Sequence, residues 1–386
     1  MPTTIMEVHL TDAIVLYGDT LRHPNILWRT QFSAPDPVVY IESGDRHVLL
    51  VGGLEIGRAR KQAAVSEVRQ FDSPEWRERY QSGGEYDAHA AGIAGVLTEL
   101  GADRIRVEAD FPIALARALE EHDVVVEVAN DLFRIERRHK TPEEQDAIAT
   151  TQAAAVSSMR NARELLKKAE IRDGKLWHDG QPLTSAVVVA TIEQELLRHN
   201  CVTESTIVTA GPGAADPHVS DTGHLDANTG IIIDIYPVDK ASHYFGDITR
   251  TYVVGEPSEN WVRMYEAVKT THQKALSMVR DGVSGRAIHN AVCQALYDAG
   301  FGASTEGFER QGVAIMNHGT GHGVGLMVHE APRINSFDNQ LKEGDVVTIE
   351  PGLYSEADGS VRLENTVVVT ADGYRELTDI GLEWTP

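Results

Sequence analysis

Short apolar runs alternate with amphipathic stretches over roughly the first 130 residues. The runs are rich in Val and Ile, which favours strands, and the stretches between them have helical character. Strands that alternate with helices of this length predict an α/β layer domain. No glycine-rich phosphate-binding motif is found there, so a nucleotide site is not indicated. The predicted strands are residues 38–43, 47–53, 105–110 and 124–130, and the clearest helices are 86–101 and 111–123.

The pattern changes at residues 133–142, FRIERRHKTP, a basic cluster in an otherwise acidic chain. Thr141 followed by Pro142, with Glu144 three residues after the threonine, predicts a helix that begins with a capping box. We therefore expect two domains, residues 1–137 and residues 138–386.

The second domain is predicted to be α+β. It contains three helical segments, residues 143–171, 185–200 and 258–300, interleaved with apolar strands, and it ends in a strand-rich third. This order is typical of helices packed on an antiparallel sheet.

Length and charge narrow the class of protein. A chain of 386 residues is long enough for two domains. It carries 35 Lys and Arg against 58 Asp and Glu, a formal charge of −23, which disfavours binding to nucleic acid or to anionic membranes. No apolar run approaches the roughly 18–20 residues that span a bilayer. The N-terminal residues have the wrong charge pattern for a targeting peptide, and the only cysteines, Cys201 and Cys293, form no pair motif. We expect a cytoplasmic protein with free thiols.

Four strand-like runs each carry a carboxylate among apolar neighbours. An unpaired ionised carboxylate in such a setting is costly, so a partner must compensate it. One such residue would be unremarkable, but four in one domain point to bound divalent metal. The four are Asp234 in GIIIDIYPV, Asp247 in YFGDITRTYVV, Glu350 in DVVTIEPGLY and Glu364 in SVRLENTVVV.

Histidines form a second group. His318, His322 and His329 lie within twelve residues, and four glycines are interspersed between Gly319 and Gly325. Glycines permit close approach of the backbone, so the segment fits a metal or substrate pocket, although a plain loop is the alternative.

Four carboxylates and at least one imidazole make an oxygen-rich donor set. Such a set suits Mn²⁺ or Co²⁺ better than a closed structural zinc site, although Zn²⁺ could also occupy it. It can neutralise two divalent ions with a hydroxide between them, the arrangement used by dinuclear aminopeptidases.

These motifs, in order and context, resemble the metallopeptidases of the pita-bread fold, which include methionine aminopeptidase, aminopeptidase P, prolidase and creatinase. The resemblance runs from about Arg138 to Thr378 and rests on IIIDIYPV, GDITRT, GTGHGVG, TIEPGLY and VRLEN. The additional N-terminal α/β domain is similar to that of the aminopeptidase P, prolidase and creatinase branch, whose members are commonly homodimers.

The resemblance implies a role for each ligand. Asp234 would chelate one ion, Asp247 and Glu364 would bridge both, and His322 and Glu350 would complete the other. Glu350 would also accept a proton from the water that bridges the metals.

The resemblance also implies substrate contacts. His329 resembles the histidine that contacts the scissile peptide, and His218 resembles a second pocket histidine. His318 matches a histidine of the proline-specific members. Arg362 lies two residues before Glu364, so strand alternation places both on one face; it could orient substrate or only offset local negative charge. Tyr354, in the motif of Glu350, is also predicted to bind substrate.

Two departures from the family pattern concern the ligands. Asp234 and Asp247 are 13 positions apart, two more than is commonest in the family, and we expect a longer hairpin that keeps both on one face. Asn365 follows Glu364 where an acidic residue is frequent.

The expected reaction is hydrolysis of the Xaa-Pro bond at the N-terminus of a dipeptide or short peptide. The short chain favours a prolidase-like dipeptidase, with an aminopeptidase as the close alternative. A metal-free creatinase-like C–N hydrolase, a dinuclear lyase on the same scaffold and a protein-binding pseudoenzyme also remain open. A serine hydrolase is disfavoured because no nucleophile-elbow motif is present.

Overall fold

The chain folds into two compact units, Met1–Ile135 and Glu136–Pro386, in a computed structural model. The division falls two positions before the predicted boundary. The structure describes residues 12–130, 132–217, 219–220 and 223–386.

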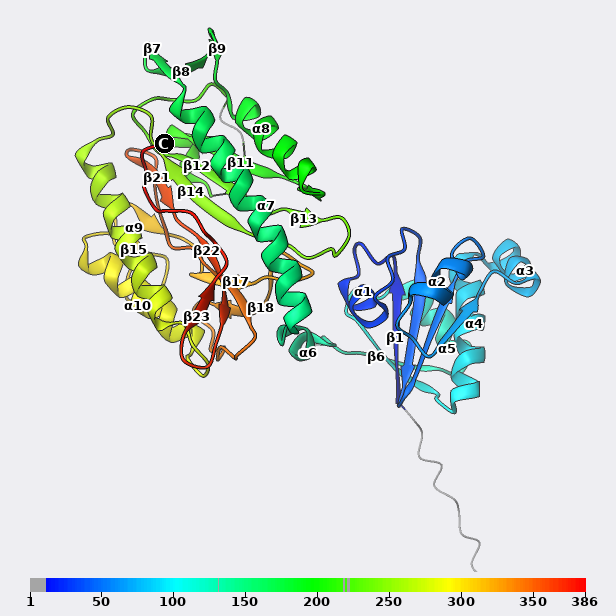
Figure 1. Ribbon diagram of the computed structural model, residues 1–386. Helices are drawn as coiled ribbons and strands as arrows, with labels where there is room; N and C mark the ends of the chain where they lie inside the picture. The colour runs from blue at the N-terminus through cyan, green and yellow to red at the C-terminus, as the bar shows by residue number, and fades with distance from the viewer. Residues whose placement is uncertain (1–11, 131, 218, 221–222) are drawn as a thin grey trace, which may run out of the picture. The chain divides into compact units, whose positions relative to one another are not determined.

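A mixed six-stranded sheet forms the centre of the first unit (Figure 1). Its order is β4-β3-β2-β1-β5-β6; β1 pairs antiparallel with β2 and parallel with β5. The strands are β1 (Asp12–Gly18), β2 (Val38–Ser43), β3 (Arg46–Val51), β4 (Glu67–Gln70), β5 (Arg104–Val107) and β6 (Val125–Val128). The helices are α1 (Pro24–Thr30), α2 (Ile56–Gln62), α3 (Pro74–Gly83), α4 (Glu85–Leu100) and α5 (Ile113–Glu120).

Both faces of this sheet are covered by helices. Successive strand side chains point to opposite faces, so Val39 and Ile41 of β2 pack in the cluster that contains α4 and α5. Val38 and Tyr40 pack in the cluster that contains α1 and α2. The predicted α/β layer domain is therefore observed.

The helices of the second unit largely follow the sequence pattern. Thr141 caps α7 (Pro142–Lys167) in the predicted capping box with Glu144. α7 ends before residue 171 because the turn at Asp173–Gly174 starts a hairpin. The predicted segment 258–300 is two helices, since Ser284 caps a new one after Gly282 takes a positive φ. The remaining helices are α6 (Arg134–Arg138), which crosses the division between the units, α8 (Ser185–Arg198), α9 (Glu259–Met278) and α10 (Gly285–Asp298).

The strands of the second unit form several sheets between these helices. α7 and α8 pack on β11, β12 and β14, and α9 and α10 pack on β19 to β22 (Figure 1). The main strands are β11 (Thr206–Ala210), β12 (Ile231–Ile235), β14 (Ile248–Tyr252), β17 (Gly321–Gly323), β18 (Glu330–Ile334), β19 (Val346–Ile349), β20 (Gly352–Ser355), β21 (Gly359–Arg362), β22 (Asn365–Val369) and β23 (Tyr374–Glu376). Shorter ones are β7 (Glu170–Arg172), β8 (Lys175–His178), β9 (Gln181–Pro182), β10 (Cys201–Val202), β13 (Val238–Asp239), β15 (Gly302–Ala303) and β16 (Ile315–Met316), and a 3₁₀ turn covers Gly211–Ala215.

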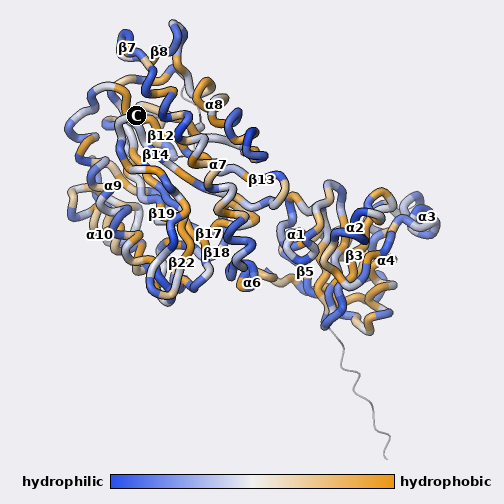
Figure 2. The backbone as a smooth tube through the Cα atoms, in the orientation of Figure 1, coloured by the Kyte–Doolittle hydropathy of each residue, from blue (hydrophilic) through white to orange (hydrophobic). Residues whose placement is uncertain are grey.

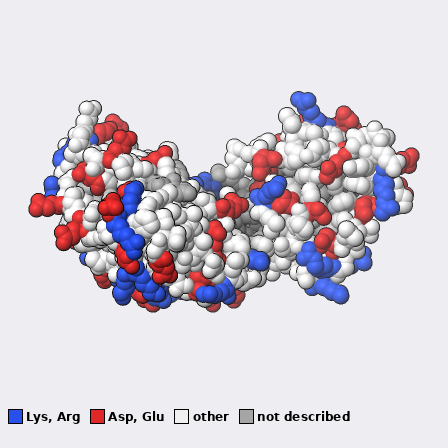
Figure 3. All heavy atoms as spheres, turned by 90° about the horizontal axis from the view of Figure 1, so that it is seen from above, with Lys and Arg blue, Asp and Glu red and all other residues white. Residues whose placement is uncertain are grey.

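Apolar residues concentrate on the central strands and on the inner sides of the helices (Figure 2). This packing confirms the α+β class predicted for the second unit. On the face drawn in Figure 3, acidic and basic side chains are interspersed. Within the described residues, no helix combines the length and the apolar character needed to cross a membrane.

Candidate functional site

A cavity of about 530 Å³ lies in the second unit. Tyr354 does not line it, and His218 lies outside the described residues. The cavity brings together eight of the ten predicted site residues: Asp234, Asp247, His318, His322, His329, Glu350, Arg362 and Glu364.

Strand pairing places the two aspartates on one face. Asp234 of β12 pairs with Thr249 of β14, and cross-strand partners share a face. Asp247 lies two residues before Thr249 and therefore points to the same side. The longer hairpin between β12 and β14 thus preserves the facing of both carboxylates.

Glu350 and Glu364 are brought together by a second ladder. β19 and β22 are antiparallel and end on the pair Ile349–Asn365. One step beyond that pair, Glu350 lies opposite Glu364. The Glu364 backbone N–H donates to the Thr249 carbonyl oxygen at 3.0 Å, which links this ladder to β14.

His322 occupies β17, between β18 and β19. A side chain at Gly321 would collide with the Thr348 carbonyl oxygen, and one at Gly323 with that of Ala331. Glycines are required here because the flanking strands approach the backbone so closely. The glycine-rich segment is therefore not a plain loop: it contains β17, which places His322 between β18 and β19.

The imidazole of His322 presents its Nε2 to the carboxylates. Its Nδ1 lies 3.2 Å from the Gly323 carbonyl oxygen, which favours the tautomer with the proton on Nδ1. Nε2 then faces Asp247 Oδ2 at 3.6 Å and Glu350 Oε1 at 3.4 Å. Burial, and next the neighbouring His329, lowers the pKa of His322 to about 3, so the ring is neutral and able to bind a metal.

The buried carboxylates repel one another. Burial, and then the charge of Asp234, raises the pKa of Glu364 to about 7. Burial and then Glu364 likewise raise the pKa values of Asp247 and Glu350 well above the ordinary range. Glu364 is therefore the charge at the centre of the group.

The donor set fits bound cations. Asp247, His322 and Glu364 each offer a ligand atom within 4.8 Å of the others. Asp234 Oδ1 is buried with no hydrogen-bond partner in the described part of the chain. A bound cation would compensate the buried, unpaired Asp234 oxygen, and it would also bind the neutral His322 ring nitrogen that faces Asp247 and Glu350. Asp234, Asp247, His322, Glu350 and Glu364 could therefore hold divalent metal.

Arg362 is engaged by the protein itself. It donates to Asp234 Oδ2 at 2.5 Å, to the Tyr354 hydroxyl at 2.9 Å and to Thr249 Oγ1 at 3.2 Å. The Tyr354 hydroxyl donates in turn to His318 Nε2 at 2.8 Å, because His318 Nδ1 faces the Gly319 carbonyl oxygen. Arg362 thus fixes the candidate ligand Asp234, and Tyr354 fixes the pocket histidine His318.

Several supporting residues were not predicted from the sequence. The Gln152 side chain accepts from the Asp247 backbone N–H at 2.7 Å and donates to its carbonyl oxygen at 2.9 Å. The guanidinium of the buried Arg250 donates to the Glu364 carbonyl oxygen at 2.5 Å and to Asn365 Oδ1 at 2.9 Å. Asn365, the departure from the family pattern, thus has a defined role as an acceptor. The one sequence feature that could have indicated Gln152 is a glutamine on the otherwise alanine-rich face of α7.

Arg333 is the other unpredicted residue. It lines the cavity and is exposed. Its guanidinium makes no hydrogen bond or ion pair with any residue that the structure describes. It is therefore available to an anionic group of a bound molecule.

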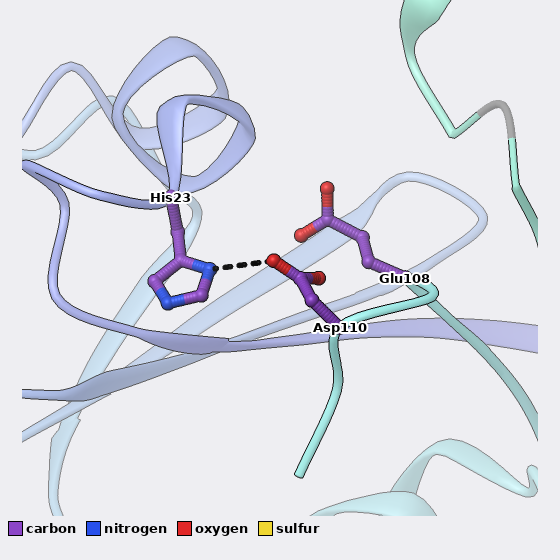
Figure 4. A group of neighbouring side chains, drawn as sticks. All are labelled: His23, Glu108 and Asp110. Atoms are coloured by element: carbon purple, nitrogen blue, oxygen red, sulfur yellow. Dashed lines mark ion pairs between the residues drawn. The ribbon is translucent and has the colours of Figure 1, made fainter.

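A second group of possible ligands occurs in the first unit. Figure 4 shows the ring of His23, before α1, facing Asp110, with Glu108 beside them after β5. His23 Nδ1 lies 3.7 Å from Asp110 Oδ2, and Glu108 accepts from Asn25 Nδ2 at 2.6 Å. Asp110 is exposed and Glu108 already has a protein donor, so we assign no site to this group.

In metal-free protein, the buried carboxylates of the site should destabilise the fold increasingly as the pH rises from 6.5 to 8.5. The raised pKa of Glu364 means that the folded state holds a proton that the unfolded state has released, so the free energy of unfolding falls with pH, by about 1 kcal/mol from Glu364 alone. Asp247 and Glu350 act in the same direction. Buried histidines such as His272 and His322 act in the opposite direction near pH 6.5, because an unfolded imidazole is about half protonated there while burial keeps these rings neutral in the fold. The contribution of Glu364 is therefore the part of the slope that Glu364→Gln removes. Urea titrations of chelated protein would measure the slope.

The matched control is the same protein with divalent metal restored. Metal binds the deprotonated carboxylates, so its stabilising effect should grow with pH. Parallel curves with and without metal would contradict a cation site at these carboxylates.

Comparisons with known proteins show which family the chain is similar to. The matching family is metallopeptidase family M24, over residues 146–371. A Xaa-Pro dipeptidase from Pyrococcus furiosus is 29% identical over 355 residues, covering 90% of this chain and 89% of that protein. One from Pyrococcus horikoshii is 35% identical over 175 residues, so the match spans 45% of this chain and about half, 46%, of that relative.

The fold is also matched by solved structures. The prolidase from Pyrococcus horikoshii superposes with a TM-score of 0.78 at 26% identity, covering 97% of this chain and 95% of that one. The predicted pita-bread fold is confirmed. The family match spans more than half of the chain and includes all five candidate ligands, and the chain therefore belongs to metallopeptidase family M24.

Proposed function

We propose that the protein hydrolyses the bond between the N-terminal residue and proline in Xaa-Pro dipeptides. The observation that carries this is one cavity with five candidate ligands, His318, His329 and an unpaired Arg333. An arginine fork suits the C-terminal carboxylate of a dipeptide. The names of the Pyrococcus relatives support the same substrate class.

We propose that Asp234, Asp247, His322, Glu350 and Glu364 hold two divalent ions, with Mn²⁺ or Co²⁺ preferred and Zn²⁺ possible. Such ions would supply Lewis-acid activation of the scissile carbonyl and of the attacking water. The oxygen-rich donor set supports this choice of metals.

The side chains of the chain handle the proton and the substrate. Glu350 accepts the proton from the attacking water and returns it to the proline nitrogen as the C–N bond breaks. His329, and His218 from outside the described residues, stabilise the developing oxyanion and the leaving nitrogen. Arg333 binds the substrate carboxylate, and Arg362 orients Asp234.

Wild-type protein loaded with Mn²⁺ should cleave Ala-Pro faster than Ala-Pro-Ala and Ala-Ala. A hydrogen bond to a charged group contributes about 1.5–3 kcal/mol, so the carboxylate contact should favour the dipeptide by about 10–100-fold in kcat/KM. Side-by-side kinetics on the three peptides measure this. Faster cleavage of Ala-Pro-Ala would instead identify an aminopeptidase, and equal turnover of Ala-Ala would remove the proline preference.

The matched controls are the two arginines. Arg333→Met should lose the preference for Ala-Pro over Ala-Pro-Ala while metal content is unchanged. Arg362→Lys should slow both peptides alike, because its partners are Asp234 and Tyr354. If Arg362→Lys lost cleavage of the dipeptide selectively, Arg362 rather than Arg333 would be the residue that binds the substrate carboxylate.

A homodimer and a cytoplasmic location also remain predictions. The dimer follows from the family resemblance, and the location follows from the composition and cysteine usage. Light scattering of the purified protein and fractionation of cells would test them.

A further inference from the structure

The basic segment at the start of the second unit is paired with two buried carboxylates. Arg138 binds Asp345 through both carboxylate oxygens, at 2.7 and 2.6 Å. Arg137 contacts Glu330 Oε2 at 2.5 Å, and Lys140 contacts Glu330 Oε1 at 2.5 Å. The segment that stood out in the sequence therefore has partners about 190 residues away in the chain.

The Glu330 pairs are buried. The side chain of Lys140 is 1% exposed and that of Glu330 is 9% exposed. A buried charge is tolerated only when it is paired, and removing one partner leaves the other uncompensated. The carboxylate also lies against the bare backbone of Gly325, where a Cβ would collide with it. Glu330 is thus fixed from both sides.

His329, the residue before Glu330, faces the cavity. It lines the cavity, yet the residue is exposed and lies in the loop of residues 324–329 that joins β17 to β18. Its ring packs edge-on against His322 with the centroids 4.3 Å apart. Its backbone continues directly into that of Glu330, so the position of the imidazole depends on where Glu330 is anchored.

Glu330 and His329 are adjacent in the chain but have different surroundings: Glu330 is bound by Arg137 and Lys140, and His329 lines the cavity. Neither Arg137 nor Lys140 lines the cavity, whereas His329 does. We propose that Lys140 and Arg137 are positioning residues for His329: they hold Glu330, and so keep the neighbouring imidazole against His322 in the cavity. The proposal rests on the proposed function in one respect only: the kinetic test uses Ala-Pro as the substrate.

Lys140→Met should lower kcat for Ala-Pro about 10-fold with KM almost unchanged, because a misplaced group costs rate before it costs binding. Lys140→Arg should restore most of the rate. In a His329→Asn background, Lys140→Met should cause no further loss, since its effect passes through His329. An equal loss in that background, or a lower melting temperature with unchanged kcat, would overturn the proposal.

Two further variants separate positioning from folding. Arg138→Met breaks a buried pair of the same kind in the same segment, and should lower stability while keeping kcat within about twofold. The Lys140→Met/Glu330→Gln double variant removes both charges of the most buried pair and leaves only Arg137, whose side chain is 11% exposed, so it should fold and still show the reduced kcat. Full activity of the double variant, or an equal loss of rate in Arg138→Met, would contradict a specific role for the Glu330 anchor.

A readout without substrate keeps the two proposals distinguishable. In metal-free protein with isotope-labelled histidine, the Cε1–H resonance of His329, assigned from His329→Asn, should reflect packing against His322. Lys140→Met should shift it toward the position of an imidazole without a neighbouring ring, and an unchanged resonance would overturn the positioning role. Wild-type protein that cleaves none of the three peptides would reject the proposed function and leave this measurement valid.

Discussion

Glu364→Ala should abolish peptidase activity, lowering kcat/KM by at least about 10³-fold, more than the roughly 10–100-fold that an outer-shell partner costs. Glu364 is 2% exposed and is the largest charged contributor to the raised pKa values of both Asp247 and Glu350. A cation bound among these carboxylates is therefore expected to interact most strongly with Glu364. Metal content by elemental analysis and kinetics on Ala-Pro would check both losses together.

Asp234→Ala is the matched comparison. One carboxylate oxygen of Asp234 is already compensated by Arg362. The loss of Asp234 should therefore reduce activity less than the loss of Glu364 and should leave one ion bound. A Glu364→Ala variant that retains two metals and substantial activity would remove Glu364 from the ligand set.

The stability of metal-free Glu364→Gln gives an independent test of the same claim. Without metal, Glu364 adds to the repulsion among buried carboxylates, so neutralising it should raise the melting temperature of the chelated protein. Added metal should then stabilise the variant less than it stabilises the wild type. A ligand that only supported the fold would change stability in the same direction with and without metal.

The candidate ligands could be recognised from the sequence because each lies at or beside a strand, in an apolar context that a lone carboxylate would not tolerate. Asp234 and Asp247 share a face through strand alternation and an even hairpin insertion, which are local rules. The capping box at Thr141 and Glu144 is local as well. Features determined by neighbouring residues were therefore predicted.

Features determined by distant residues were not predicted. The unpaired state of Arg333 depends on which carboxylates lie near it in space. The pairing of Lys140 with Glu330 joins positions 190 residues apart, and the sequence showed only an isolated basic cluster. Tyr354 was predicted to bind substrate, but it does not line the cavity; its hydroxyl instead contacts Arg362 and His318, which do. The orientation of a side chain behind a pocket depends on packing that a motif does not encode.

Glu350→Gln should lower kcat by about 10²–10⁴-fold, the usual contribution of a general base, with a smaller effect on KM. Glu350 directly follows β19, and its backbone N–H donates to the Thr320 carbonyl oxygen at 2.8 Å, which fixes it beside His322. Glutamine keeps the size and one ligand oxygen but cannot accept the proton. Kinetics on Ala-Pro from pH 6 to 9 would measure the effect.

The pH profile distinguishes a lost base from a lost ligand. Without Glu350 as acceptor, hydroxide from solvent must replace it, so the residual rate should rise steadily with pH. Excess metal should not rescue it, whereas a variant that only weakens a ligand should recover as the metal concentration rises. Rescue of Glu350→Gln by metal, with a pH profile like that of the wild type, would show that Glu350 is only a metal ligand. Another group of the cavity would then accept the proton.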